Sequence, residues 1–264
     1  MLGSYYLEPK LLYFVRRYSK HELVSVVNYL HAHGIELRTI QKGANRYAYM
    51  YIPKTISLPL NSVRLIVLLG GNAMTALDWA EWIVQTEPHI NSSNAVFLCV
   101  DYPGYGASAG VPSPTSMHVV VNESVSEAIG QLESSGSVVT NISVLGHSIG
   151  AAVATRWVAS NNSLVDTLIL SAPFTSVSEM VPEIFPFVPA WLGKLLLWHN
   201  WDTKKQLSSI PDIKIHIIHG EDDGIVPFRM GKELSGIRGK LHAITQTGHN
   251  DILNNYDIYG KLIV

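Results

Sequence analysis

The stretch NISVLGHSIGAAVATRWV, residues 141–158, decides the fold. It begins as a short apolar run of strand length and continues as a helix-like run of small residues. At the junction, Ser148 stands between Gly146 and Gly150 in the pattern G-x-S-x-G. In a sharp turn from strand to helix, the glycines let the backbones pass closely and the serine projects above the sheet. The pattern therefore predicts a nucleophilic serine at the carboxyl end of a strand.

The same alternation of strand and helix runs through most of the chain. Near-continuous runs of Val, Ile and Leu, typical of strands buried on both faces, occur at 63–70, 94–102, 141–146, 166–172, 213–220 and 240–246. Helical periodicity or composition occurs between them, at 76–85, 116–135, 149–160, 230–237 and 251–264. This order predicts an α/β fold with a mostly parallel sheet and helices on both faces. Two further runs, 35–41 and 46–53, predict an antiparallel hairpin at the sheet edge.

One apolar and aromatic interval, residues 178–201, interrupts the alternation. We expect one or two short helices inserted between strands there, because three prolines exclude a continuous helix: Pro182, Pro186 and Pro189. The expected organisation is a single domain over 1–264, with a helical extension over 1–34 and a cap-like insertion over 175–211.

A serine nucleophile needs a base and an orienting carboxylate, which in this kind of turn follow along the chain in the order acid, then histidine. His249 comes directly after the last predicted strand, where a base could reach Ser148. The other histidines after the serine lie inside strands, at a strand end or in the insertion: His199, His216, His219 and His242. The acid should follow the penultimate strand, in GEDDGIVP. The frame D-x-x-V-P selects Asp223, and Asp222 is the alternative.

The negative charge that develops on a substrate carbonyl also needs hydrogen-bond donors. One is expected to be the backbone N–H of Ile149, directly after the serine. The second is expected in the loop after the first long strand, LLGGNAMT, where Gly70 and Gly71 allow close approach of the backbone. We predict the N–H of Asn72.

Taken together, these motifs resemble the α/β-hydrolase superfamily over residues 46–260. Within it the chain looks like the serine hydrolases related to bud-emergence proteins, lysophospholipid and monoacylglycerol lipases, and protein depalmitoylases. The motifs that carry the resemblance are DYPGYGASAGVPS (101–113), LGHSIGAAVA, LILSAPFTSV (168–177), HGEDDGIVPFRMG and GHND. The chain departs from the family pattern at Gly70, where a histidine is common, and at Pro103, which replaces an arginine.

The resemblance implies hydrolysis of carboxylic esters or thioesters through an acyl-enzyme, with no cofactor, on a small-molecule or lipid acyl ester. The insertion could line an acyl pocket through Phe185, Phe187, Trp191, Leu195 and Trp198, although ordinary packing of short helices explains these residues equally well. An exposed apolar cap could also contact a membrane surface.

Composition narrows the other possibilities. The net charge is −2, which gives no sign of a nucleic-acid partner, and Cys99 is the one cysteine, so the chain has no internal disulfide. No spacing of His, Cys or Glu predicts a metal site, and no glycine-rich loop predicts a nucleotide site. The apolar runs are too short for a signal peptide or a membrane helix, so a soluble cytoplasmic protein is expected.

Two other functions stay open from the sequence. Some proteins of this fold have lost catalysis and act as binding or scaffold proteins, and peptidase activity also occurs on it. Such scaffold proteins often lack a triad member, whereas Ser148, Asp223 and His249 are all present here. A serine hydrolase is therefore the leading interpretation, and the oligomeric state is not predicted.

Overall fold

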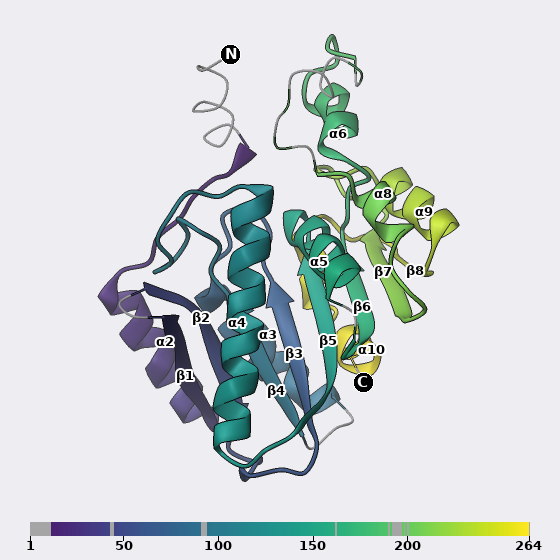
Figure 1. Cartoon of the computed structure of the whole chain (residues 1–264). Coiled ribbons are helices and arrows are strands. Elements are labelled where there is room, and N and C mark those ends of the chain that lie inside the picture. Colours follow the sequence, from purple (N-terminus) through teal and green to yellow (C-terminus); the bar gives the residue numbers. More distant parts are fainter. Residues whose placement is uncertain are drawn as a thin grey trace.

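The computed structural model describes residues 12–42, 45–90, 94–161, 163–189, 191, 197, 199 and 201–263 (Figure 1). Its strands are β1 (Ile35–Lys42), β2 (Asn45–Pro53), β3 (Val63–Leu69), β4 (Ala95–Val100), β5 (Val139–His147), β6 (Val165–Ser171), β7 (Lys214–Gly220) and β8 (Lys240–Ile244). They form one sheet in the order β1-β2-β4-β3-β5-β6-β7-β8. The pairs β1–β2 and β2–β4 are antiparallel and the remaining pairs are parallel. The mostly parallel sheet and its antiparallel edge hairpin are thus confirmed.

Helices cover both faces of this sheet (Figure 1). On one face lie α4 (Pro114–Ser134), α5 (Ile149–Ser160), α8 (Thr203–Leu207) and α9 (Phe228–Ile237). On the other face lie α2 (Lys20–Ala32), α3 (Trp79–Thr86) and α10 (Tyr256–Leu262). The helix α6 (Val177–Ile184) stands above the sheet, and the short 3-10 turns are η1 (Ala76–Asp78), η2 (Glu87–His89) and η3 (Asp251–Asn254). None of the described helices combines the length and hydrophobicity that a membrane span requires.

The central strands feed two hydrophobic cores, one on each face of the sheet. In β3, Leu65 and Val67 belong to the core beneath α4 and α5, whereas Ile66 and Leu68 belong to the core beneath α3 and α10. Successive side chains of a strand point to opposite faces, so a strand covered on both sides needs an apolar residue at every position. This requirement explains the continuous apolar runs from which the strands were predicted.

Two predicted helices differ in detail from the structure. The run 251–264 is divided into η3 and α10 at Asn255, whose side-chain amide donates to the Ile252 carbonyl and ends the first turn. In the proline-rich interval, α6 contains Pro182 in its second turn and ends at Ile184, with Phe185 as its C-cap. One short helix therefore tolerates a proline, and in the described part of the interval Pro186 and Pro189 lie beyond its end.

The turn at Ser148 depends on contacts that only glycine allows. A Cβ added to Gly150 would meet the Leu69 carbonyl oxygen at 2.1 Å, and a Cβ added to Gly146 would meet the Gly150 oxygen at 2.2 Å. The first turn of α5 therefore packs directly on the backbone of β3 and β5. This close approach brings the end of β5 against the loop that follows β3.

We expect Gly150→Ala to lower the free energy of unfolding by about 3 kcal/mol or more, since the added methyl overlaps backbone that cannot rotate away. Gly130 provides a matched control, because a Cβ there meets no atom within 4 Å. Gly130→Ala should raise stability by about 0.5–1 kcal/mol through helix propensity. Urea unfolding followed by circular dichroism measures both, and a Gly150→Ala midpoint equal to that of the native chain would contradict the packing argument.

Candidate active site

The predicted residues lie in loops at one edge of the sheet. Ser148 follows β5, Asp223 follows β7, His249 follows β8 and Asn72 follows β3. Because β3, β5, β6, β7 and β8 are adjacent and parallel, their carboxyl ends meet at the same edge. Four loops separated by up to 177 positions along the chain, from residue 72 to residue 249, are brought together in this way.

Ser148 occupies a strained position in the backbone. Its φ is 55° and its ψ is −119°, a conformation that residues with a Cβ rarely adopt and that costs on the order of 1–3 kcal/mol. Two backbone hydrogen bonds hold the turn: the N–H of Ser148 donates to the Ser171 carbonyl at 2.8 Å, and its own carbonyl accepts from Ala151 at 2.9 Å. The strain lifts the hydroxyl away from both the strand and the helix.

His249 and Asp223 form a buried pair. The Nδ1 of His249 lies 2.7 Å from Oδ2 of Asp223, and the two residues are only 8% and 9% exposed. A carboxylate accepts hydrogen bonds, so Nδ1 carries the proton and Nε2 is left with a free electron pair. The other oxygen, Oδ1, accepts the N–H groups of Ile225 and Val226 at 2.9 and 2.8 Å. Asp222, by contrast, is exposed.

His219 is a second histidine in contact with the Asp223 carboxylate. It is fully buried, and its Nε2 lies 2.9 Å from the Val226 carbonyl oxygen and 3.3 Å from Oδ2 of Asp223. A carbonyl accepts only, so Nε2 carries the proton and also faces the carboxylate. Burial alone would raise the pKa of Asp223, but the hydrogen bonds from His219 and His249 outweigh it and hold that pKa well below its ordinary value. Asp223 is therefore a carboxylate at neutral pH.

His147 packs against His249 on the opposite side. Their ring centroids are 5.0 Å apart, and Nδ1 of His147 lies 3.2 Å from the Ser171 hydroxyl, which in turn contacts the Tyr259 hydroxyl at 2.7 Å. Burial, and next the nearby His249, lower the pKa of His147 to about 3. The ring next to His249 is therefore neutral.

Ser148 and His249 are connected indirectly, through His147. His147 precedes the serine in the chain and contacts the ring of His249, yet no hydrogen bond joins the Ser148 hydroxyl to His249 among the described residues. In proteins without substrate, such a hydrogen bond is often long and tightens only when substrate binds.

The loop after β3 lies directly against the serine. A Cβ on Gly71 would meet the Ser148 Cβ at 3.4 Å and the His147 ring at 2.9 Å. The N–H groups of Asn72 and Ile149 are not donated to any group within the described ranges. Within those ranges, neither predicted donor is therefore already paired with an acceptor.

The residues predicted to line an acyl pocket are distributed differently from the expectation. Phe185, Phe187 and Trp191 are 60%, 99% and 67% exposed, so they cover no enclosed pocket. Phe185 caps the end of α6, which projects above the sheet (Figure 1), and Phe187 and Trp191 follow it in the chain. Leu195 and Trp198 lie outside the described residues. Contact of this apolar tip with a membrane surface stays a prediction.

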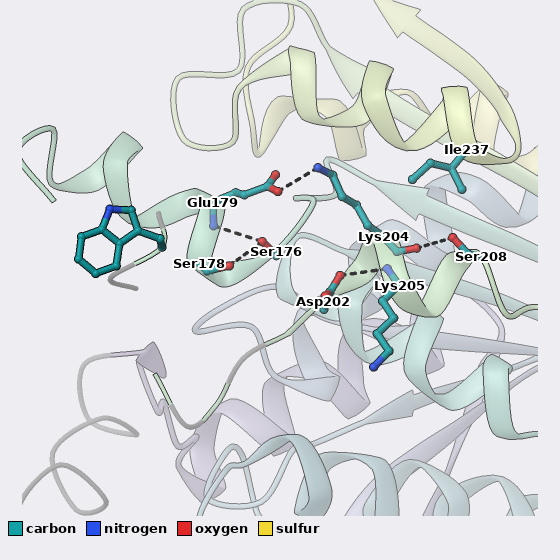
Figure 2. A pocket seen from close by; sticks show the side chains of 9 residues that line it. Ser176, Ser178, Glu179, Asp202, Lys204, Lys205, Ser208 and Ile237 are labelled. Carbon is teal, nitrogen blue, oxygen red and sulfur yellow. Dashed lines mark hydrogen bonds and ion pairs between the residues drawn. The ribbon is translucent and has the colours of Figure 1, made fainter. Parts of the chain in front are cut away.

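A hollow of about 430 Å³ lies beside α6 and α8 (Figure 2), and Ser148 is not among the described residues that line it. In Figure 2 Lys204 extends toward Glu179, which it contacts at 2.9 Å, and Lys204 also pairs with Glu233. Its cation is therefore already neutralised. None of its lining residues was predicted to be catalytic, but Trp191, predicted to line an acyl pocket, does line this open hollow. The lining residues are Ser176, Ser178, Glu179, Trp191, Asp202, Lys204, Lys205, Ser208 and Ile237.

Sequence reasoning missed two supporting histidines and one segment. His147 was read only as the polar residue inside the motif, and His219 only as a strand end. The extended segment at residues 12–18, which reaches the loop of Asn72, carries no motif at all. The segment is a short, mostly apolar run from Leu12 to Arg16, and a run of this length is too short to separate from chance.

The neutral His147 makes a pH dependence measurable. Its pKa is about 3 in the folded protein and about 6.5 in an unfolded chain, so the unfolded state binds more protons between these values. The free energy of unfolding should therefore fall as the pH drops below about 6.5, by up to about 1.4 kcal/mol per pH unit from this group. We would measure the free energy of unfolding in urea at several pH values between 5 and 7.5. Plotted against pH, it should have a clearly shallower slope for His147→Asn than for the native chain. Equal slopes would contradict a buried neutral ring.

The chain is similar in sequence to a known protein family and to curated proteins. The family model Hydrolase_4, described as serine aminopeptidase, S33, matches residues 77–211, just over half of the chain. Protein bem46 of Schizosaccharomyces pombe is 31% identical over 160 residues, which are 59% of this chain and 52% of that protein. The lysophosphatidylserine lipase ABHD12 of Xenopus tropicalis is 28% identical over 202 residues, 69% of this chain and 49% of that protein. The chain thus spans about half the length of the curated relatives it matches.

Solved structures extend the likeness over most of the chain. The crystal structure of an α/β-hydrolase from Vibrio vulnificus superposes with a TM-score of 0.68 at 18% identity, covering 93% of this chain and 86% of that one. At this identity the likeness concerns the fold. With the family match and the related sequences, it leads to one assignment: the chain belongs to the Hydrolase_4 family and is an α/β-hydrolase of the bem46 and ABHD12 type.

Proposed function

We propose that the protein is a serine hydrolase that cleaves carboxylic ester or thioester bonds through an acyl-enzyme on Ser148. The observation that carries this proposal is the buried His249–Asp223 hydrogen bond of 2.7 Å, which leaves Nε2 of His249 as a base at the sheet edge that also carries the strained, partly exposed Ser148. A histidine with a purely structural role has no need of a buried carboxylate oriented by four donors.

In the proposed first half-reaction, the Ser148 hydroxyl oxygen attacks the acyl carbon while Nε2 of His249 takes the hydroxyl proton. The carbonyl oxygen becomes negatively charged and accepts hydrogen bonds from the backbone N–H groups of Asn72 and Ile149. The tetrahedral intermediate then collapses, the bond to the leaving oxygen or sulfur breaks, and His249 returns the proton to the leaving group.

The second half-reaction repeats these steps with water. His249 takes a proton from water, the hydroxide attacks the acyl-enzyme, and the proton returns to the Ser148 oxygen as the carboxylic acid leaves. Throughout, Asp223 holds the tautomer of His249 and stabilises its cation. His219 holds Asp223 ionised, and the neutral ring of His147 adds no positive charge that would oppose protonation of His249.

The substrate class follows from chemistry and from the relatives together. ABHD12 of Xenopus tropicalis is described as a lysophosphatidylserine lipase, which supports a lipid or small-molecule acyl ester as substrate here. The family description, serine aminopeptidase, keeps amide hydrolysis as an alternative outcome. The triad chemistry is shared by all these substrates, so the leaving group is what an assay must decide.

Replacement of the proposed nucleophile is the first test. Ser148→Ala should lower kcat on p-nitrophenyl esters from acetyl to palmitoyl by at least about 10⁴-fold, since no oxygen remains to attack. Ser208→Ala, which changes an exposed serine beside the hollow of Figure 2, should match the native chain. Activity only on aminoacyl amides would favour a peptidase, and no activity of the folded native chain on any substrate would favour a scaffold protein.

Two adjacent carboxylates provide a matched pair for the second test. Asp223→Asn should lower kcat by about 10³–10⁴-fold, because an amide can donate to His249 and stabilise the wrong tautomer. Asp222→Asn changes an exposed neighbour and should stay within about twofold of the native kcat. Steady-state kinetics on the best ester measures both variants. Similar losses in the two would contradict the assignment of Asp223.

A further inference from the structure

We infer that Asn72 acts in the reaction through its side chain as well as its backbone, as a positioning residue that ties the oxyanion loop to the start of the chain. The oxyanion loop is residues 70–75, and the N-terminal clamp is the carbonyl of Leu12, the N–H of Phe14 and the side chain of Arg16. The inference rests on the proposed function, since the direction of the Asn72 N–H matters only if an acyl group is attacked at Ser148.

The amide of Asn72 is held from two sides. Its Oδ1 accepts the N–H of Phe14 at 2.8 Å, and its Nδ2 donates to the carbonyl of Leu12 at 2.9 Å. The amide therefore pairs with the clamp backbone as a neighbouring strand would. The Tyr105 hydroxyl donates to the same Oδ1 at 2.9 Å. Three hydrogen bonds fix the side chain, and the backbone N–H of the same residue is donated to no group among the residues that the structure describes.

The side chain of Arg16 binds the oxyanion loop just after Asn72. Its Nε donates to the Ala73 carbonyl at 3.0 Å, and its Nη2 donates to the Thr75 hydroxyl at 3.1 Å and pairs with Asp78. The Arg16 carbonyl accepts the N–H of Gly106 at 2.8 Å. The clamp thus holds successive residues of the oxyanion loop and is itself held from the other side.

The oxyanion loop needs such a grip because its conformation is unfavourable. Ala73 has a φ of 66°, in the left-handed region that a residue with a Cβ avoids. On its other side, Asn72 follows Gly71, which packs against Ser148. Relaxation of Ala73 would rotate the peptides on its two sides and displace Asn72 with them, so the N–H of Asn72 would leave the position from which it can reach the acyl oxygen.

The same segment also contacts Trp201, which lies within the interval 175–211. Tyr13 is 2% exposed in the core against which Leu12 also packs, and its hydroxyl accepts from the Trp201 indole at 3.1 Å. Its ring lies 5.6 Å from that of His199. The segment is therefore fixed to the scaffold on its far side, which allows the clamp to hold the loop rather than move with it.

Asn72→Ala tests the inference directly. We expect kcat on the best p-nitrophenyl ester, expressed per site titrated by a fluorophosphonate, to fall about 10- to 100-fold, with KM within about threefold. Loss of folded protein lowers the number of titrated sites without changing turnover per site, so the readout separates positioning from stability. A kcat per site within twofold of the native value would overturn the inference.

A pair of proline variants tests the clamp without touching the loop. Phe14→Pro removes the N–H that Asn72 accepts and should lower kcat per site about tenfold. Val15→Pro removes an N–H that is not donated to any group in the described part of the chain, and should stay within about twofold. Equal losses in both would overturn the inference, because they would reflect general distortion of the segment.

Ser148→Ala separates this inference from the proposed function. If Ser148→Ala is inactive while Asn72→Ala and Phe14→Pro turn over like the native chain, the hydrolase mechanism stands and the positioning role fails. If Ser148→Ala retains activity, the proposed function fails, and the positioning role fails with it.

Discussion

The buried carboxylate of Asp101 is the constraint on which the geometry around the site depends. It is inaccessible to solvent, and its oxygens accept from the N–H of Ala76 at 2.7 Å, the N–H of Ala107 at 3.3 Å and the Tyr18 hydroxyl at 2.8 Å. These donors belong to the turn η1 directly after the oxyanion loop, the loop after β4 and the segment that enters α2. Burial raises the pKa of Asp101, and the donors oppose that rise. A buried carboxylate must be satisfied in this way, so it fixes three segments relative to one another.

This constraint explains part of the DYPGYG motif in physical terms. A Cβ on Gly106 would meet the Asp101 carboxylate at 2.2 Å. The last glycine of the motif is therefore needed because any side chain there would overlap the carboxylate. Gly106 also donates its N–H to Arg16. The motif is therefore structural at Asp101 and Gly106, and it reaches the proposed chemistry only through the loops that it holds. The oxyanion loop and the base are held separately, by the clamp and by Asp223.

Features of the fold and of the site could be predicted where they depend on residues close together in the sequence, and not where they depend on contacts between distant residues. The strands, the turn at Ser148 and the order of the loops follow from local periodicity and from glycine, and the sheet confirms them. Asp223 and His249 were predicted from their place after β7 and β8, and the structure puts their side chains in contact. The roles of His147 and His219 depend on packing between strands, and the clamp joins residues 57 to 60 positions apart. Such contacts leave no periodic trace in one sequence. The exposed Phe187 shows the converse, since an apolar residue need not face a pocket.

One measurement tests the central claim most directly: the site at which a fluorophosphonate reacts with the native, folded chain, located by peptide mass spectrometry. A phosphonyl group is attacked only by an activated nucleophile, and its oxygen then takes the place of the acyl oxygen. The account predicts one adduct per chain, on the peptide that contains Ser148, and its loss in His249→Ala. An adduct on another serine, or none in a chain that hydrolyses esters, would contradict the account.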